Sequence, residues 1–87
     1  MMPHTKIYLQ HFGFGIDDFI PCEVCGAKSV DIHHIQGRGK NKNVIINLVA
    51  VCRKCHRAAH GLEKTYLHKD IIQQIHNEYL QRYENTH

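Results

Sequence analysis

The chain has 87 residues, of which 43% are hydrophobic and 22% are charged. This length and composition fit one small folded domain over residues 1–87 and do not favour a disordered protein. The net charge of +3 is unevenly distributed. Six basic residues and no acidic residue lie between Ile32 and Leu62, whereas the remainder carries five basic residues against eight acidic ones. The basic stretch indicates a polyanion partner, and a solvated surface loop is the alternative.

No apolar run approaches the roughly 20 residues that a membrane helix needs, so no membrane partner is expected. The first six residues are not followed by the apolar region of a secretory signal, and we expect a cytoplasmic protein. A chain this short buries only about 60% of the surface that its unfolded form exposes. Small domains therefore commonly depend on a metal or on disulfides for stability.

The N-terminal segment contains no predicted chemistry. Residues 6–9 fit either a strand or the first turn of a helix, and Gly13 and Gly15 end that element. His4 and His11 are interpreted as surface residues rather than metal ligands. We expect the apolar residues of the segment to cover the core: Phe12, Phe14, Ile16 and Phe19.

A β-hairpin is predicted in the middle of the chain. Residues 29–35 are rich in β-branched side chains and predict a strand, and residues 36–43 have the composition of a loop. Residues 44–46 and 48–51 flank Asn47, and the second of these segments is the better strand candidate. We expect it to pair with residues 29–35.

Two helices are predicted after the hairpin. The first is short, reaches residue 59 or 60, and is ended by Gly61. The second covers about residues 66–83, and its buried face packs on the domain or on a second copy of it, which would make a homodimer. His68 and His76 lie in this helix and are interpreted as structural or solvent-facing. The apolar positions that define its buried face are Leu67, Ile71, Ile72, Ile75, Tyr79, Leu80 and Tyr83.

Four cysteines form two Cys-x-x-Cys pairs: Cys22 and Cys25, then Cys52 and Cys55. This spacing favours one zinc ion held by four thiolates, and two disulfides are the alternative. Two chelating turns joined by a hairpin, the second running into a helix, are typical of the treble-clef zinc site. An all-thiolate site has no open position for substrate, so this zinc is predicted to be structural.

Four histidines suggest a second metal site. His56 and His60 are four apart on the predicted helix, so both imidazoles project from one face and can bind one ion, although a surface pair is the alternative. His33 and His34 are adjacent, and neighbours on a regular strand face opposite sides. If the strand ends or bends at Ile35, one of these histidines can bind metal while the other stays free as a base.

These polar residues resemble those of the HNH endonucleases, which have a ββα-metal fold. The similarity is strongest to small HNH proteins of bacteria and phages that carry four zinc-binding cysteines, and it covers roughly residues 22–61. The fold class implied is a small α+β protein with a treble-clef, zinc-stabilised ββα-metal fold and an additional C-terminal helix. The residues that carry the resemblance are Asp31-Ile32-His33-His34-Ile35, Asn47, Cys55-His56 and His60.

The resemblance implies a role for each polar residue. His34 would be the general base, and His33 and His56 would bind one divalent ion (Mg²⁺, Mn²⁺, Zn²⁺ or Ni²⁺), with His60 as a further ligand. Asn47 would keep the loop and the base histidine oriented. Cleavage of DNA in this family leaves a 3′-hydroxyl and a 5′-phosphate. A neutral imidazole is a suitable base near pH 7, and a divalent ion can stabilise charge on the phosphate and leaving oxygen.

Two positions leave alternatives open. Many relatives have a proline and two glycines in the loop after the histidine pair, whereas this chain has Gly37-Arg38-Gly39, so Arg38 is presented differently. Asp31 is either a hydrogen-bond acceptor for one ligating histidine or a polar strand residue. The residues predicted to contact nucleic-acid phosphates are Arg38, Lys40, Lys42, Arg53, Lys54 and Arg57.

The sequence therefore predicts a metal-dependent endonuclease that hydrolyses DNA in the cytoplasm of a bacterial or phage-infected cell. A non-catalytic zinc module that binds nucleic acid is the first alternative. A structural interaction domain with incidental histidines is the second. Neither alternative requires His33 and His34 together with Asn47, His56 and His60.

Overall fold

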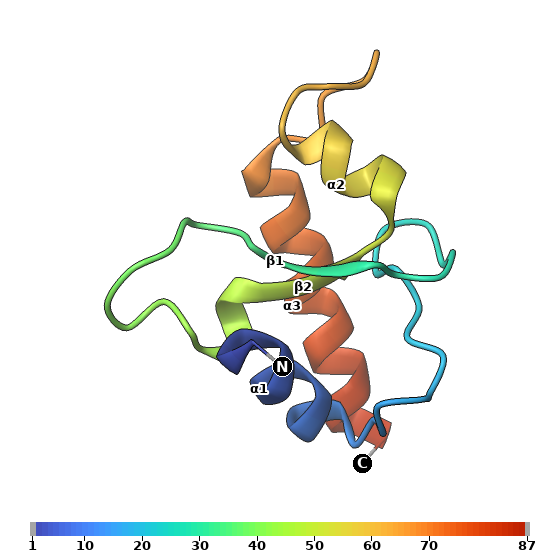
Figure 1. The fold of residues 1–87 in the computed structure, drawn as a ribbon, viewed down its shortest axis with the longest axis vertical. Coiled ribbons are helices and arrows are strands. Elements are labelled where there is room, and N and C mark those ends of the chain that lie inside the picture. The colour runs from blue at the N-terminus through green and yellow to red at the C-terminus, as the bar shows by residue number, and fades with distance from the viewer. Residues whose placement is uncertain (1, 87) are drawn as a thin grey trace.

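An antiparallel hairpin of two short strands lies at the centre of the structure, a computed structural model that describes residues 2–86 (Figure 1). The small α+β architecture and the central hairpin predicted from the sequence are confirmed. Within residues 2–86, no helix combines the length and hydropathy needed to cross a bilayer. In chain order the elements are α1 (Pro3–Phe12), β1 (Asp31–His34), the 3-10 helix η1 (Ile45–Asn47), β2 (Leu48–Val51), α2 (Arg53–Ala59) and α3 (Lys69–Thr86).

The pairing of the strands assigns each side chain to one of two faces. The register pairs Asp31 with Val51, Ile32 with Ala50, His33 with Val49, and His34 with Leu48. Because successive side chains alternate, His33 and His34 lie on opposite faces of the hairpin. All four residues of β2 are buried, since both faces of this strand are covered.

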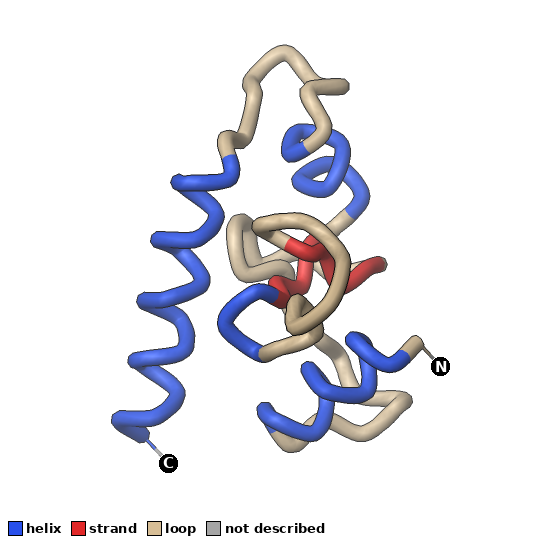
Figure 2. The backbone as a smooth tube through the Cα atoms, turned by 90° about the vertical axis from the view of Figure 1, so that its left-hand side faces the viewer, coloured by secondary structure: helices blue, strands red, loops and turns tan. Residues whose placement is uncertain are grey.

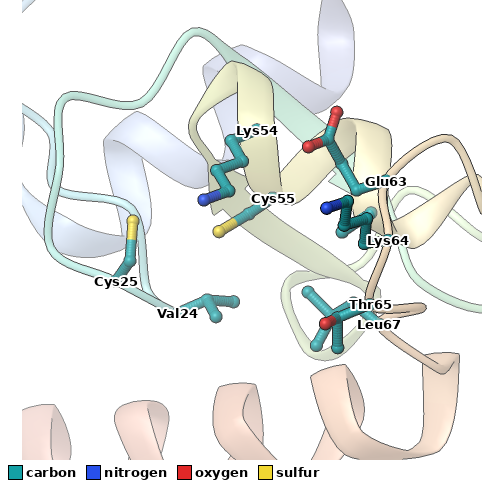
Figure 3. A pocket seen from close by; sticks show the side chains of 9 residues that line it. Val24, Cys25, Lys54, Cys55, Glu63, Lys64, Thr65 and Leu67 are labelled. Atoms are coloured by element: carbon teal, nitrogen blue, oxygen red, sulfur yellow. The ribbon is translucent and has the colours of Figure 1, made fainter.

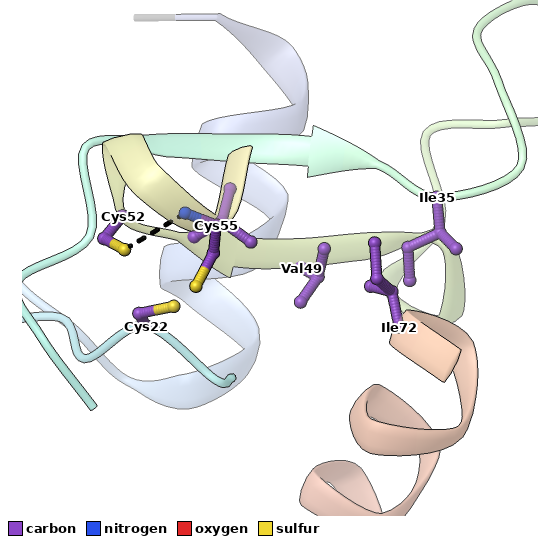
Figure 4. Packing of buried hydrophobic residues seen from close by; sticks show 7 residues of the cluster. Cys22, Ile35, Val49, Cys52, Cys55 and Ile72 are labelled. Atoms are coloured by element: carbon purple, nitrogen blue, oxygen red, sulfur yellow. Dashed lines mark hydrogen bonds between the residues drawn. The ribbon is translucent and has the colours of Figure 1, made fainter. Parts of the chain in front are cut away.

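Two apolar clusters fill these faces, and α3 contributes to both of them. The long helix runs beside the hairpin, with α1 on the other side of the molecule (Figure 2). Ile72 and Leu80 are eight positions apart in α3, so they lie on one helix face two turns apart. The cluster facing α1 contains Tyr8, Phe12, Ile32, Leu48, Ala50 and Leu80. The opposite cluster contains Cys22, Ile35, Val49, Val51, Cys52, Cys55 and Ile72 (Figure 4).

A buried polar network joins four segments of the chain. The Glu23 carboxylate accepts hydrogen bonds from the Tyr8 hydroxyl at 2.5 Å and from His76 Nδ1 at 2.7 Å. The other His76 nitrogen, Nε2, donates to the Ile45 carbonyl at 2.6 Å. The His76 imidazole is therefore held at both of its ring nitrogens. The network ties α1, the first cysteine turn, η1 and α3 together.

The structure resolves the ambiguous N-terminal segment in favour of a helix. Residues 6–9 lie inside α1, and Gly13 ends the helix in the left-handed conformation, with a φ of 71°. Such a φ suits glycine, which has no Cβ to clash with the backbone. The prediction that His4 is a surface residue is wrong, because it lies on the same helix face as Tyr8 and is only 4% exposed. His11 is half-buried.

Three further predictions need correction: the burial of the apolar residues after α1, the bounds of the last helix, and the burial of Ile71. Phe12 is buried and Phe14 half-buried, as predicted, but Ile16 and Phe19 are 76% and 60% exposed. These two residues lie in an irregular segment that carries no regular helix or strand face to align them with the core. Helix α3 starts at Lys69, three residues later than predicted, and ends at Thr86. Ile71 is 50% exposed rather than buried.

Candidate metal centres and active site

The four cysteines come together in one cluster. Their sulfur atoms all lie within 4.8 Å of one another, and the thiols are free rather than paired as disulfides. The sulfurs of Cys25 and Cys52 are 3.6 Å apart. Tetrahedral zinc with a Zn–S distance of about 2.3 Å places its sulfurs about 3.8 Å apart. The donor set and its spacing therefore fit one zinc ion with no open position.

Local backbone geometry positions both cysteine pairs. The first pair lies in a turn closed by a hydrogen bond from the Gly26 N–H to the Cys22 carbonyl, and Gly26 has a φ of 82°. The second pair begins α2, where the Cys52 sulfur caps the helix by accepting from the Cys55 N–H at 3.4 Å. Burial raises the pKa of the Cys52 thiol, but this N–H and the neighbouring thiols lower it to about 7. The thiolate is the form that binds metal.

Three histidines, His33, His56 and His60, form a second cluster. Ligand nitrogens of His33, His56 and His60 lie within 4.8 Å of one another. The Nε2 atoms of His56 and His60 are 3.2 Å apart. Metal–nitrogen distances of about 2.0–2.1 Å place adjacent imidazole ligands about 3.0–3.4 Å apart. Strand β1 supplies His33, α2 supplies His56, and the residue that caps the end of α2 supplies His60. The donor set fits one divalent ion.

Asp31 lies on the same face of β1 as His33 and approaches the cluster beside His56. Its Oδ2 atom is 3.4 Å from His56 Nδ1. A carboxylate in this position favours a proton on His56 Nδ1, which leaves the lone pair on Nε2. The other nitrogen of His56 indeed faces His60.

Burial favours the neutral form of His33 and His56. It lowers the pKa of His33 to about 4, together with repulsion from His56 and His60, while Asp31 opposes the shift. Burial also lowers the pKa of His56, which Asp31 again opposes. Neutral imidazole is the form that donates a lone pair to a metal ion.

His34 faces away from this cluster, towards α1, and is 7% exposed. Its Nε2 atom is 2.8 Å from Asn43 Oδ1. An amide oxygen only accepts, so Nε2 carries the proton and Nδ1 carries the lone pair. Within residues 2–86 this Nδ1 atom is buried and has no hydrogen-bond partner. His34 nevertheless lines the same cleft as the three clustered histidines, which has a volume of about 220 Å³.

Asn47 connects the two ends of the loop over residues 36–43. Its Oδ1 accepts from the Gln36 N–H at 2.7 Å, and its Nδ2 donates to the carbonyls of Gly37 at 3.2 Å and Lys42 at 2.9 Å. The side chain is 5% exposed. All three of its bonds go to the loop backbone, so Asn47 fixes the loop and is not placed to contact substrate.

The predicted phosphate-binding residues do not share one environment. Arg38 lines the histidine cleft, and Arg53 lies on the His56 and His60 side of α2 by its spacing of three and seven residues. Arg57 instead binds the Glu63 carboxylate at 2.8 Å. Lys54 lines a different pocket. Lys40 and Lys42 are exposed on the loop.

A larger pocket, of about 610 Å³, lies beside the cysteine cluster rather than the histidines (Figure 3). Val24 and Leu67 contribute apolar side chains to it, and Lys54 and Lys64 line its polar side. No histidine lines this pocket, and its carboxylate, Glu63, is already paired with an arginine. The smaller histidine cleft is therefore the candidate active site.

Two residues near the site were missed by the sequence reasoning. The His4 ring centroid is 4.5 Å from that of His34. Asn43, which was assigned only to a loop, bonds to His34. A helical reading of residues 3–12 would have found His4, because His4, Tyr8 and Phe12 then form one buried face at intervals of four. No local signal identifies Asn43.

Comparisons with known proteins agree with this geometry. Residues 22–62 match the model of the HNH endonuclease family. A mitochondrial DNA mismatch repair protein mutS homolog from Sarcophyton glaucum is 33% identical over 73 residues, covering 68% of this chain and 7% of that protein. The chain thus spans a small fraction of the length of this relative, and no solved structure matches it. The matched segment contains both metal-ligand clusters and both strands, and residues 22–62 form a domain of the HNH endonuclease family.

Proposed function

We propose that the chain is a metal-dependent endonuclease that hydrolyses DNA phosphodiester bonds. The observation that carries this proposal is the shared cleft, where a three-histidine metal site lies beside His34 and Arg38. The proposal assigns His34 as general base and gives the divalent ion to His33, His56 and His60. The mismatch-repair relative supports DNA as the nucleic acid, since its name refers to DNA.

The chain's own residues supply most of the required chemistry. His34 keeps its Nδ1 lone pair free to accept a proton from the attacking water, while Asn43 holds Nε2. Burying a nitrogen without a hydrogen-bond partner lowers the stability of the fold by about 1–3 kcal/mol. A general base needs such a free lone pair to accept a proton. Arg38 adds positive charge where the phosphate would lie. A divalent ion, when bound, supplies charge that stabilises the phosphate and the leaving oxygen.

The remaining assignments follow from this proposal. Asp31 orients His56, and Asn47 holds the loop that presents Arg38. The cysteine cluster is proposed to be a treble-clef site for structural zinc, because two cysteine turns are joined by a hairpin and the second opens a helix. Hydrolysis would leave a 3′-hydroxyl and a 5′-phosphate. A cytoplasmic location and a dimer formed through α3 stay predictions.

Cleavage of supercoiled plasmid tests the proposal. We expect wild-type protein to cut in the presence of one or more of Mg²⁺, Mn²⁺, Zn²⁺ and Ni²⁺. We expect His34→Ala to lose about 10²- to 10⁴-fold in cleavage rate, the usual contribution of a general base. Zinc content, thermal stability and DNA binding without added ion should remain, because His34 holds neither the zinc nor a phosphate.

The control is His68→Ala, which removes an exposed histidine outside the cleft. Full activity of His34→Ala would refute the base assignment. Wild-type protein that binds DNA but cuts it with none of these ions would favour the non-catalytic zinc module, for which the exposed basic loop is the supporting feature.

A further inference from the structure

A histidine from outside the HNH segment covers the proposed base. His4 belongs to α1, whereas the family match starts at residue 22. The His4 side chain is buried, with 4% of its surface exposed. Its ring lies against that of His34, with a centroid distance of 4.5 Å and an interplanar angle of 56°. We propose that His4 is a positioning residue that holds the His34 imidazole in one orientation and one tautomer.

The position of His4 is fixed by the helix that carries it. Tyr8 lies one turn further along α1 and is fully buried. Its hydroxyl donates to the carboxylate of Glu23, a residue next to Cys22 in the cysteine turn. Phe12, a further turn along, packs into the cluster that covers one face of the hairpin. The face of α1 that carries His4 is thus anchored at two points, which makes the contact with His34 a fixed feature of the fold.

His34 requires such support because its only side-chain hydrogen bond within the described residues 2–86 goes to an exposed loop residue. Asn43 accepts from Nε2 at 2.8 Å. The ring torsion of histidine is broad, so the rotamer alone does not fix the plane of the imidazole. A half-turn of the ring would direct carbon at Asn43 and move Nδ1 to the opposite side. The His4 ring occupies space beside His34 and opposes that rotation.

The chemistry of His4 suits this role. Burial lowers its pKa, as do the neighbouring His34 and Arg38, while Asp31 acts in the opposite direction. A neutral ring beside the base does not repel the positive charge that His34 acquires when it takes a proton. A lysine or arginine at this position would oppose that step.

The inference rests on the proposed function for its catalytic meaning, and its test has a readout that needs no activity. Protein labelled with ¹⁵N-histidine reports the tautomer of each ring through long-range ¹H–¹⁵N correlations. We expect the neutral form of wild-type His34 to be a single tautomer, protonated at Nε2. His4→Ala should give averaged nitrogen shifts at His34, because the ring then samples both orientations.

The same variant is also tested by measuring kcat and KM for DNA cleavage. We expect His4→Ala to lower kcat about 10- to 100-fold with little change in KM, as for a displaced reacting group. His4→Phe restores a flat buried ring and should recover the single tautomer and most of the rate. Leu9→Ala is the matched control, because Leu9 is buried in α1 but lies on a different side of the helix from His4. It should lower thermal stability and leave the His34 tautomer and kcat unchanged.

Three outcomes would overturn the inference: an unaltered His34 spectrum in His4→Ala, an unaltered kcat in an active enzyme, or equal losses in Leu9→Ala. If His4→Ala fails to fold, His4→Val replaces it, since valine keeps an apolar side chain in the buried position but provides no ring. A wild-type protein that cuts no DNA, yet shows a His34 tautomer that depends on His4, would refute the proposed function and support the positioning role.

Discussion

Two adjacent histidines in β1 have different environments because strand side chains alternate. His33 faces α2 and joins the three-histidine cluster, whereas His34 faces α1 and bonds to Asn43. The strand is regular through His34, so alternation alone separates the two side chains and no bend is needed. The alternation also places Asp31 behind His56, on the same face as His33.

The lowered pKa of His33 predicts a specific loss of stability in acid. Burial, His56 and His60 hold the pKa at about 4 in the folded chain, against an ordinary value of 6.5. Between pH 6.5 and 4 the unfolded chain binds more protons at this residue, so the free energy of unfolding falls as the pH falls through this window. Above 6.5 the contribution is fully present, and below 4 it changes no further.

Chemical denaturation without added divalent ion measures this effect in wild-type protein and in His33→Asn. Protonation of the cysteine cluster affects both proteins, so the difference between them isolates His33. We expect a shallower decline of stability in the variant. Equal slopes in the two proteins would contradict the prediction.

At the scale of elements, the loop over residues 36–43 is held at both ends by neighbouring structure. Asn47 binds its backbone from within η1. Helix α3 adds Gln73, whose Nε2 donates to the Ile46 carbonyl at 2.7 Å and whose Oε1 accepts from the Gln36 side chain at 3.2 Å. The loop carries Arg38 towards the histidine cleft, so its anchors affect substrate contact.

We expect Gln73→Ala to weaken DNA binding more than it slows the chemical step. The variant loses the contacts of α3 with Gln36 at the start of the loop and with Ile46 in η1. The free energy of unfolding should fall by about 1 kcal/mol. Fluorescence anisotropy with labelled DNA gives the Kd, and plasmid cleavage gives kcat. The control is Gln74→Ala, an exposed neighbour in the same helix. A Gln73→Ala protein with wild-type Kd would show that the loop needs no support from α3.

The elements also show which local sequence signals are sufficient to predict a helix or a strand. The short helix α2 was predicted because its ends are set locally, by the Cys52 cap and by Gly61 with a φ of 74°. The type of the first element was ambiguous in the sequence, because Gly13 and Gly15 mark its end without specifying whether a helix or a strand precedes them. Residues 44–46 were a weak strand candidate, and 45–46 instead begin η1, which places Asn47 inside the fold.

At the scale of the whole molecule, helices outside the HNH segment complete the site. α1 provides the ring that covers His34, and α3 holds η1 through His76 and Gln73. Glu23 links both helices to the first cysteine turn through its bonds to Tyr8 and His76. Three of the four cysteines also belong to the apolar cluster that contains Ile72, so the cysteine site connects that cluster with both flanking helices.

Loss of the cysteine site should consequently unfold the protein. Structural zinc contributes about 10–16 kcal/mol in zinc-finger peptides, and the net stability of a small domain is about 5–15 kcal/mol. We expect Cys52→Ala to lose helical circular dichroism and cooperative melting, together with its bound zinc. His60→Ala, which alters only the histidine cluster, should keep one zinc per chain and a folded spectrum. A Cys52→Ala protein as heat-stable as wild type would contradict a structural zinc.

The sequence by itself determined the features that depend on short spacing. Two Cys-x-x-Cys pairs and histidines four apart on a helix are local patterns, so backbone geometry alone brings their ligand atoms close. The alternation of a strand likewise places His33 and His34 on opposite faces. Only the tertiary structure decided which distant groups meet. In the fold, His4 is buried against His34 and Asp31 lies beside His56. Arg57 pairs with Glu63, and Lys54 lines another pocket. These contacts depend on how helices pack across the hairpin, and no spacing within a single element specifies that packing.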